Sequence, residues 1–144
     1  MYTGLLHLHN LLRWVILLLL LIAIFQAFSK SGGLKKTSLF LLIAAHTQFL
    51  IGFYQWFTGS FGYTLIKNNG FGEVMKNTAQ RFWAVEHMAG MLIAIILITI
   101  ARGKVKRGDY GPASWMYIIA LILILAVVPW PFREGIGRPW FPGM

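Results

Sequence analysis

Apolar residues dominate four stretches of the chain, and shorter polar stretches separate them. The apolar stretches cover about residues 4–28, 37–57, 81–101 and 113–128. Each approaches the roughly 20 residues that an α-helix needs to cross the hydrocarbon core of a bilayer. The first has no basic residues before it and no small-x-small cleavage site after it, which favours a retained span over a cleaved signal peptide. The pattern predicts an all-α fold, an integral membrane four-helix bundle that forms a single domain over residues 1–144.

The polar stretches predict how the spans connect. Residues 31–33 (Ser-Gly-Gly) end the first span, residues 102–108 end the third, and Pro129 and Pro131 stop the fourth. The longest connection, 58–80, is rich in Gly and Asn and is expected to hold a short interfacial helix around 73–77. Short connections join antiparallel neighbours, so the expected topology is up-down.

Composition supports a membrane protein and excludes several kinds of chemistry. Apolar residues make up 58% and charged residues 12% of the chain, against about 45–50% and 25% in soluble domains. There is no cysteine, which excludes disulfides, thiolate metal sites, covalent c-type haem attachment and cysteine nucleophiles. A metal would be held by His, carboxylate, Met or a cofactor. No dinucleotide, His-Glu-x-x-His or Gly-x-Ser-x-Gly motif is present.

The net charge of +9 is explained by cationic loops that face anionic lipid rather than by nucleic-acid binding. Two short connections carry a concentrated set of basic residues: Lys30, Lys35 and Lys36 in the first, and Arg102, Lys104, Lys106 and Arg107 in the third. The opposite side has a sparser set: Lys67, Lys76 and Arg81 in the long connection, and Arg133 and Arg138 in the tail. Cytoplasmic loops carry the excess of Lys and Arg, so both termini are expected on the non-cytoplasmic side.

All four histidines, His7, His9, His46 and His87, lie in or at the mouth of a span. At about 1.5 Å per residue, His9 and His87 lie roughly 8–9 Å below the outer starts of their spans, and His46 roughly 16 Å below the outer end of its span. Three helices are thus expected to point imidazoles into the outer half of the bundle. Each histidine taken singly is explained by a hydrogen bond between helices. Three at similar depth favour a shared ligand.

Haem suits two neutral imidazoles on facing helices in an apolar pocket. With both axial positions of the iron filled, the expected task is electron transfer rather than oxygen chemistry. Spans one and three lie diagonally in an up-down bundle, so His9 with His87 is the first choice of iron ligands and His46 with His87 the second. His7 lies nearer the surface and is expected to be a bystander, or a ligand if the first helix starts earlier.

Two charged residues accompany the histidines. Arg13 lies one turn after His9 on the same face and needs an anionic partner, either Glu86 across the bundle or a bound anion such as a haem propionate. The alternative is an arginine that snorkels to the headgroups. Glu86, beside His87, is a candidate proton acceptor for quinol oxidation.

The spans also carry stripes of like residues. In the second span, small and polar residues predict a helix–helix seam, and bulky ones are placed to wall a macrocycle or to pack: the first stripe is Ala44, Gln48, Gly52 and Gln55, and the second is His46, Phe49, Leu50 and Phe53. In the third span, Ala84, Gly90 and Ala94 share the side of His87 and leave room for a flat ring or for close helix packing.

Three segments, LHLHNLLRW (6–14), AHTQ (45–48) and RFWAVEHM (81–88), resemble small bacterial four-helix membrane proteins of the cytochrome b type. The resemblance covers nearly the whole chain, and a more distant one extends to the cytochrome b561 and copper-resistance D membrane families. It implies haem b, one group and at most two, on histidines at positions that correspond to His9, His46 and His87. The distant families often have more helices and a second haem, for which this chain has too few well-placed histidines.

The leading hypothesis is therefore a membrane b-type cytochrome, or cytochrome subunit, of the bacterial inner membrane. It would pass electrons between the quinone pool and a partner protein or larger membrane complex, rather than act as a stand-alone enzyme. The alternative is a non-redox accessory subunit whose histidines bridge helices or bind a metal ion such as copper or zinc. A transporter would want polar residues in both membrane halves.

Overall fold

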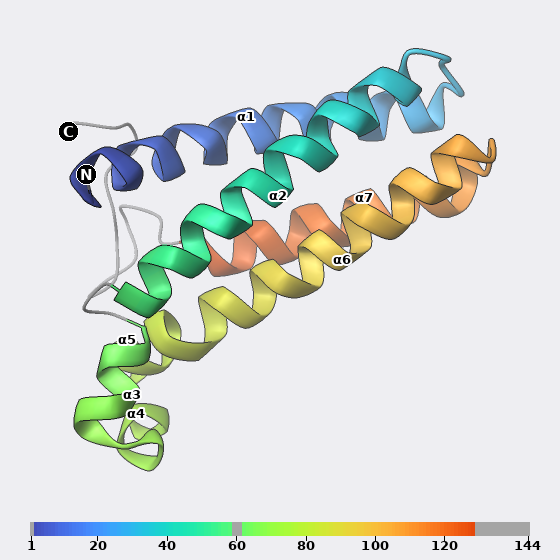
Figure 1. Ribbon diagram of the computed structural model, residues 1–144. Coiled ribbons are helices and arrows are strands. Elements are labelled where there is room, and N and C mark those ends of the chain that lie inside the picture. The colour runs from blue at the N-terminus through green and yellow to red at the C-terminus, as the bar shows by residue number, and fades with distance from the viewer. Residues whose placement is uncertain (1, 59–61, 129–144) are drawn as a thin grey trace.

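The computed structural model describes residues 2–58 and 62–128, and these ranges are almost entirely helical. Two hairpins of long helices make the bundle: α1 (Tyr2–Phe28) with α2 (Leu34–Thr58), and α6 (His87–Lys106) with α7 (Tyr110–Val127). Short helices link the hairpins: α3 (Tyr63–Asn69), α4 (Phe71–Lys76), α5 (Thr78–Arg81) and the π-helical turn η1 (Phe82–Glu86), which runs directly into α6. The short helices extend beyond one end of the bundle (Figure 1).

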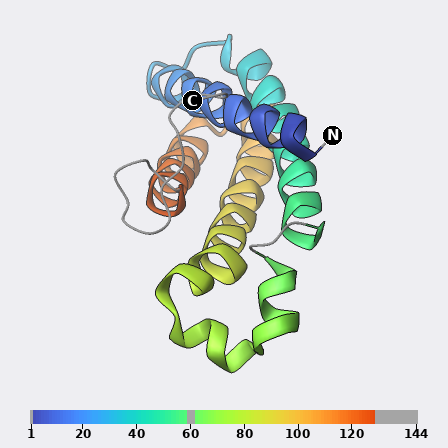
Figure 2. The same cartoon turned by 90° about the vertical axis from the view of Figure 1, so that its left-hand side faces the viewer.

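Each long helix packs on two others, which fixes the diagonal pairs. α1 packs on α2 and α7, and α6 packs on the same two helices. The four helices run in alternating directions, so the start of α1 and the end of α7 lie at one end and the two tight turns at the other (Figures 1 and 2). α1 and α6 therefore face each other across the bundle axis.

Four helices are long and apolar enough to cross a membrane, as the apolar stretches predicted. α1 has 27 residues, α2 has 25, the continuous helix Thr78–Lys106 has 29 and α7 has 18. At about 1.5 Å per residue these helices are roughly 27–44 Å long. The predicted interfacial helix is present as α4, one to two residues earlier than expected, whereas α3 was not expected. Pro129 and Pro131 lie outside the described residues.

Both tight turns end their helices in the same way. Lys30 has a left-handed backbone (φ 54°), and the N–H of Ser31 donates to the carbonyl of Gln26 at 2.9 Å. Gly108 (φ 81°) and the N–H of Asp109, which donates to Lys104 at 2.9 Å, repeat this pattern at the end of α6. These are Schellman caps, which satisfy the last carbonyls of a helix and turn the chain sharply. Because the helices alternate in direction, both turns and their basic residues lie at one end of the bundle.

The most deeply buried apolar side chains concentrate in the half of the bundle that is nearer the basic turns. In three helices the core cluster occupies only that half: Ile16 to Ala27 in α1, Leu34 to Ala45 in α2, and Ala94 to Val105 in α6. The half that contains the starts of α1 and α6 contributes mostly partly buried side chains. The bundle is thus tightly packed at its basic end and more open where His9 and His87 lie.

Candidate cofactor site

The structure brings His9 and His87 together across the bundle. Their ring centres are 6.4 Å apart, and the ring planes are inclined at 66°. His9 comes from α1 and His87 from the first position of α6, the two helices that face each other diagonally. His9 and His87 lie at similar distances from the starts of their continuous helices, at Tyr2 and Thr78, and both helices start at the same end of the bundle. The two imidazoles therefore lie at one level.

The hydrogen bond of His87 determines which ring nitrogen carries the proton. Its Nδ1 lies 2.6 Å from the backbone carbonyl oxygen of Val127, at the end of α7. A carbonyl only accepts hydrogen bonds, so Nδ1 is the protonated nitrogen and Nε2 keeps its lone pair. Histidines that bind metals are commonly oriented by such a bond from the other ring nitrogen. The α7 backbone therefore orients the His87 ring.

His9 is seated by α2. The side-chain amide of Gln48 donates to the backbone carbonyl of His9 at 2.7 Å, and a Cβ built on Gly52 would lie 3.1 Å from His9 Cε1. The predicted stripe of Gln48 and Gly52 thus lies in the contact of α2 with α1. Nδ1 of His9 is buried and has no hydrogen-bond partner among residues 2–58 and 62–128. A buried polar atom of this kind is costly unless something binds it.

Aromatic side chains and a π-helical turn surround His87. The His87 N–H donates to the carbonyl of Phe82, five residues earlier, which is the hydrogen bond that defines a π-helix. The ring centres of Phe82 and Trp83 lie 5.7 and 6.1 Å from that of His87. From α2, Trp56 Nε1 donates to the carbonyl of Ala84 at 2.8 Å and so holds the turn. Sequence reasoning missed this turn, although π-turns are frequent at functional sites.

The pair of histidines fits a shared metal centre in spacing and in chemistry. Imidazole nitrogens bind first-row metals at about 2 Å, and the centre of an imidazole ring lies roughly 1 Å beyond its nitrogen, so one metal ion between two imidazoles would separate the ring centres by about 6 Å. The observed separation is 6.4 Å. The described residues contain no cluster of three or more His, Asp or Glu side chains for a metal held by protein alone. Histidine is a ligand that haem iron accepts.

The structure does not bring His46 to this pair. His46 lies at the midpoint of α2, is exposed, and its Nε2 is 3.0 Å from the Thr99 hydroxyl of α6. Thr99 follows His87 by about three helical turns, roughly 18 Å along the axis. The expectation that three imidazoles share the outer half is therefore not met, because His46 faces outward at mid-helix. His7 is also exposed, although α1 starts earlier than expected.

The two charged candidates have separate partners. Nη2 of Arg13 donates to the Asn10 side chain at 3.1 Å, and its guanidinium carbon lies 5.0 Å from the ring centre of Trp14. Glu86 forms an ion pair with Arg81 at 3.6 Å, and its side chain is 45% exposed. The acid that was considered as a partner for Arg13 is therefore paired within its own segment. Arg13 remains one turn from His9.

The bulky stripe of the second span and the small residues of the third span do not line a pocket for a macrocycle. Leu50 and Phe53 of the bulky stripe are exposed on the outside of α2. Gly90 lies against α7, where an added Cβ would be 2.6 Å from Cγ1 of Val127, and Ala94 belongs to the core cluster. The small side of α6 thus serves helix packing. That packing also places the carbonyl that His87 uses.

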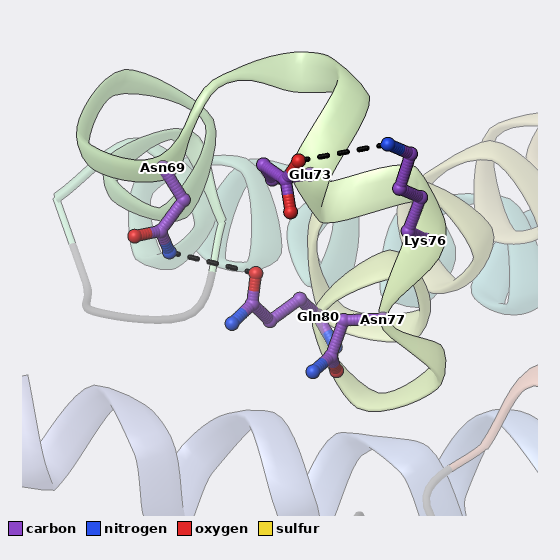
Figure 3. Close-up of a pocket in the computed structure, with 5 residues that line it drawn as sticks. All are labelled: Asn69, Glu73, Lys76, Asn77 and Gln80. Atoms are coloured by element: carbon purple, nitrogen blue, oxygen red, sulfur yellow. Dashed lines mark hydrogen bonds and ion pairs between the residues drawn. The ribbon is translucent and has the colours of Figure 1, made fainter.

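A polar pocket of about 400 Å³ lies on the linking helices and is a separate feature (Figure 3). Its lining includes the ion pair of Glu73 with Lys76 at 3.6 Å and the contact of Asn69 with Gln80 at 3.5 Å. Both charged side chains are largely exposed. Among the described residues that line it, Glu73 is the one carboxylate and none is a histidine.

Comparisons with known proteins found no matching family model, no matching curated protein and no matching solved structure.

Proposed function

We propose that this protein is a b-type cytochrome, or cytochrome subunit, of a bacterial inner membrane, with one haem b held between His9 and His87. The observation that carries the proposal is the meeting of these two imidazoles from diagonally opposed helices, with ring centres 6.4 Å apart. The bond from His87 Nδ1 to Val127 and the unpartnered, buried Nδ1 of His9 support it. Four long apolar helices make a lipid bilayer the expected surroundings.

If haem were bound, His9 and His87 would hold it, and it would supply one-electron chemistry. His87 keeps its Nε2 lone pair directed by the backbone of α7, and His9 is held against Gly52. Phe82 and Trp83 lie beside the His87 ring. Arg13, one turn from His9, supplies a cation for a propionate. The described residues form no soluble redox domain, so electrons would pass between the quinone pool and a partner protein or larger complex.

Membrane orientation follows from the basic turns. The seven Lys and Arg residues at 30, 35, 36, 102, 104, 106 and 107 lie at one end of the bundle. Loops with such an excess face the cytoplasm. The proposal therefore places the start of α1, the end of α7 and the histidine pair toward the outer side.

An absorption spectrum tests the proposal. Protein purified in mild detergent from a haem-replete host should show a Soret band and a sharp reduced α-band. Both bands should be lost in His9→Ala and in His87→Ala but kept in His46→Ala, a matched control because His46 lies roughly 18 Å further along the bundle. Folded protein without either band, also after titration with hemin, would rule the proposal out.

A second candidate function is a non-redox accessory subunit whose histidines join helices. Two hydrogen bonds favour it: His87 to Val127 joins α6 to α7, and His46 to Thr99 joins α2 to α6. A ring separation of 6.4 Å also suits direct edge contact between two aromatic rings. In that case His9→Ala would leave a colourless protein colourless, and His87→Ala would lower its stability.

A further inference from the structure

The middle of α2 carries two polar side chains on a surface that is otherwise apolar. His46 is the midpoint of the helix Leu34–Thr58, and both His46 and Thr47 are exposed. The neighbouring Ile43 and Leu50 are 55% and 70% exposed. Polar side chains at the centre of a membrane helix are costly toward lipid and usually face protein. Ile43 and Leu50 lie on an exposed side of α2, and His46 lies on the flank of that side next to α6, where it bonds to Thr99.

The hydrogen bonds of His46 leave one acceptor unused. The Thr99 hydroxyl donates its proton to the Ile95 carbonyl at 2.7 Å, so its oxygen must accept from His46 Nε2 at 3.0 Å. His46 Nε2 is then protonated, and Nδ1 of the neutral ring is an acceptor. Among the residues that the structure describes, no group donates to this nitrogen.

Thr47 offers the matching donor. Within the described parts of the chain its hydroxyl makes no hydrogen bond, in contrast to Thr37 and Thr99, which donate to carbonyls four residues earlier. The unused donor and the unused acceptor are adjacent in sequence, so their depths differ by only about 1.5 Å. One copy of the chain thus presents a self-complementary pair at the middle of the membrane.

Helix geometry shows how two copies would meet. At about 100° per residue, Ile43 and Leu50 point in nearly the same direction, while His46 lies roughly 50° to one side of them and Thr47 roughly 50° to the other. When two parallel helices are related by a twofold axis along the membrane normal, each flank of one helix faces the opposite flank of the other. Thr47 of each copy then faces His46 of the other copy.

We propose that this face of α2, formed by Ile43, His46, Thr47 and Leu50 and called here the α2 seam, joins two copies of the chain in a parallel twofold dimer. Ile43 and Leu50 form the centre of the contact. On both sides the Thr47 hydroxyl of one copy donates to His46 Nδ1 of the other. The α2 seam shares no residue with the pair His9 and His87, so the dimer does not depend on haem.

Cysteine cross-linking in membranes tests the dimer directly, because the natural chain has no cysteine. Leu50→Cys, at the centre of the seam, should give an oxidised, disulfide-linked product of about twice 16.3 kDa. Leu18→Cys, on α1 and 60% exposed, is the control and should stay monomeric. The proposal is overturned if Leu50→Cys stays monomeric, links no better than Leu18→Cys, or forms an adduct of another mass with a different protein.

A second pair of variants tests the hydrogen bonds. In the Leu50→Cys background, Thr47→Val removes the donor and should lower the cross-linked fraction about three- to tenfold, since hydrogen bonds between membrane helices contribute modestly. Thr47→Ser keeps the hydroxyl and should retain the product. Helix content measured by circular dichroism should be equal in both, because Thr47 is exposed. An undiminished product in Thr47→Val would refute the reciprocal bonds.

Discussion

Nδ1 of His87 and the carbonyl oxygen of Val127 lie 2.6 Å apart, so the last turn of α7 orients a side chain at the first position of α6. A backbone carbonyl is not removed by a side-chain substitution. Its place depends on how closely α7 approaches α6, and Gly90 permits that approach. The orientation of His87 is therefore coupled to packing one turn further along its own helix.

Gly90→Ala should destabilise the bundle by about 1–3 kcal/mol through overpacking. The added Cβ would lie 2.6 Å from Cγ1 of Val127 and would push α7 away. Adding Val127→Ala removes the obstructing methyl groups and should recover part of the loss, a coupling that thermal unfolding in detergent can measure. Gly111→Ala, with no atom within 4 Å of its new Cβ, is the control and should not be destabilised. Equal costs with and without Val127→Ala would contradict this account.

Gly52→Ala should weaken hemin binding with little change in stability. Its Cβ would lie 3.1 Å from Cε1 of His9, so the ring must shift by a few tenths of an ångström. Misplacing a ligand by even that distance strains a metal site, whereas alanine is favourable in a helix by about 0.5–1 kcal/mol. Absorbance titrations with hemin, paired with melting curves, separate the two effects. A titration identical to that of the natural protein would show that His9 is not held by this contact.

Trp56→Phe should loosen the π-turn that precedes His87. The substitution keeps an aromatic ring but removes the Nε1–H that donates to the Ala84 carbonyl at 2.8 Å. The expected cost is about 0.5–1.5 kcal/mol, as for one lost hydrogen bond. Amide hydrogen exchange should become faster in residues 82–87 and stay unchanged in α7. Trp115→Phe, a 63% exposed position, is the comparison and should alter neither quantity.

Membrane orientation can be measured by thiol labelling, again because no native cysteine interferes. Gly32→Cys in the first basic turn and Asn68→Cys on α3 both lie at exposed positions. A membrane-impermeant maleimide added to intact spheroplasts should label Asn68→Cys at once, and Gly32→Cys only after permeabilisation. The reverse pattern would place the histidine pair near the cytoplasm.

Sequence patterns were sufficient for the four helices because long apolar runs leave few other structures in a membrane. The same reasoning placed His9 and His87 at one level, since depth follows from counting residues along helices of known rise. Rotation about the helix axis was harder to predict. His46 was expected inside the bundle, yet it lies on an exposed flank of α2 beside α6, where it bonds to Thr99. The core packing of Leu41 and Ala45 decides which way α2 turns.

Two parts of the candidate site cannot be recognised from the types of residue in the sequence. The Val127 carbonyl belongs to the backbone, which is chemically the same at every position. The π-turn depends on a single hydrogen bond that skips one residue more than an α-helix does. Gly52 was identified as part of a seam, but only the structure shows that His9 is the side chain resting on it.

The π-turn changes how the two parts of one helix are rotated relative to each other, compared with a regular α-helix of the same residues. In an uninterrupted α-helix, residues five apart differ by about 500°, which would direct Phe82 roughly 140° away from His87. The wider turn instead brings the two rings to 5.7 Å. If the same residues formed a regular α-helix, everything before the turn would be rotated by about 100° relative to α6. Deleting one residue between 82 and 86 should restore a regular α-helix in which Phe82 and His87 are four residues apart, about 400°, and should therefore keep the two rings on one side. The extra residue of this short segment is thus accommodated by the wider turn, which keeps the linking helices and the aromatic cover of His87 aligned with the bundle.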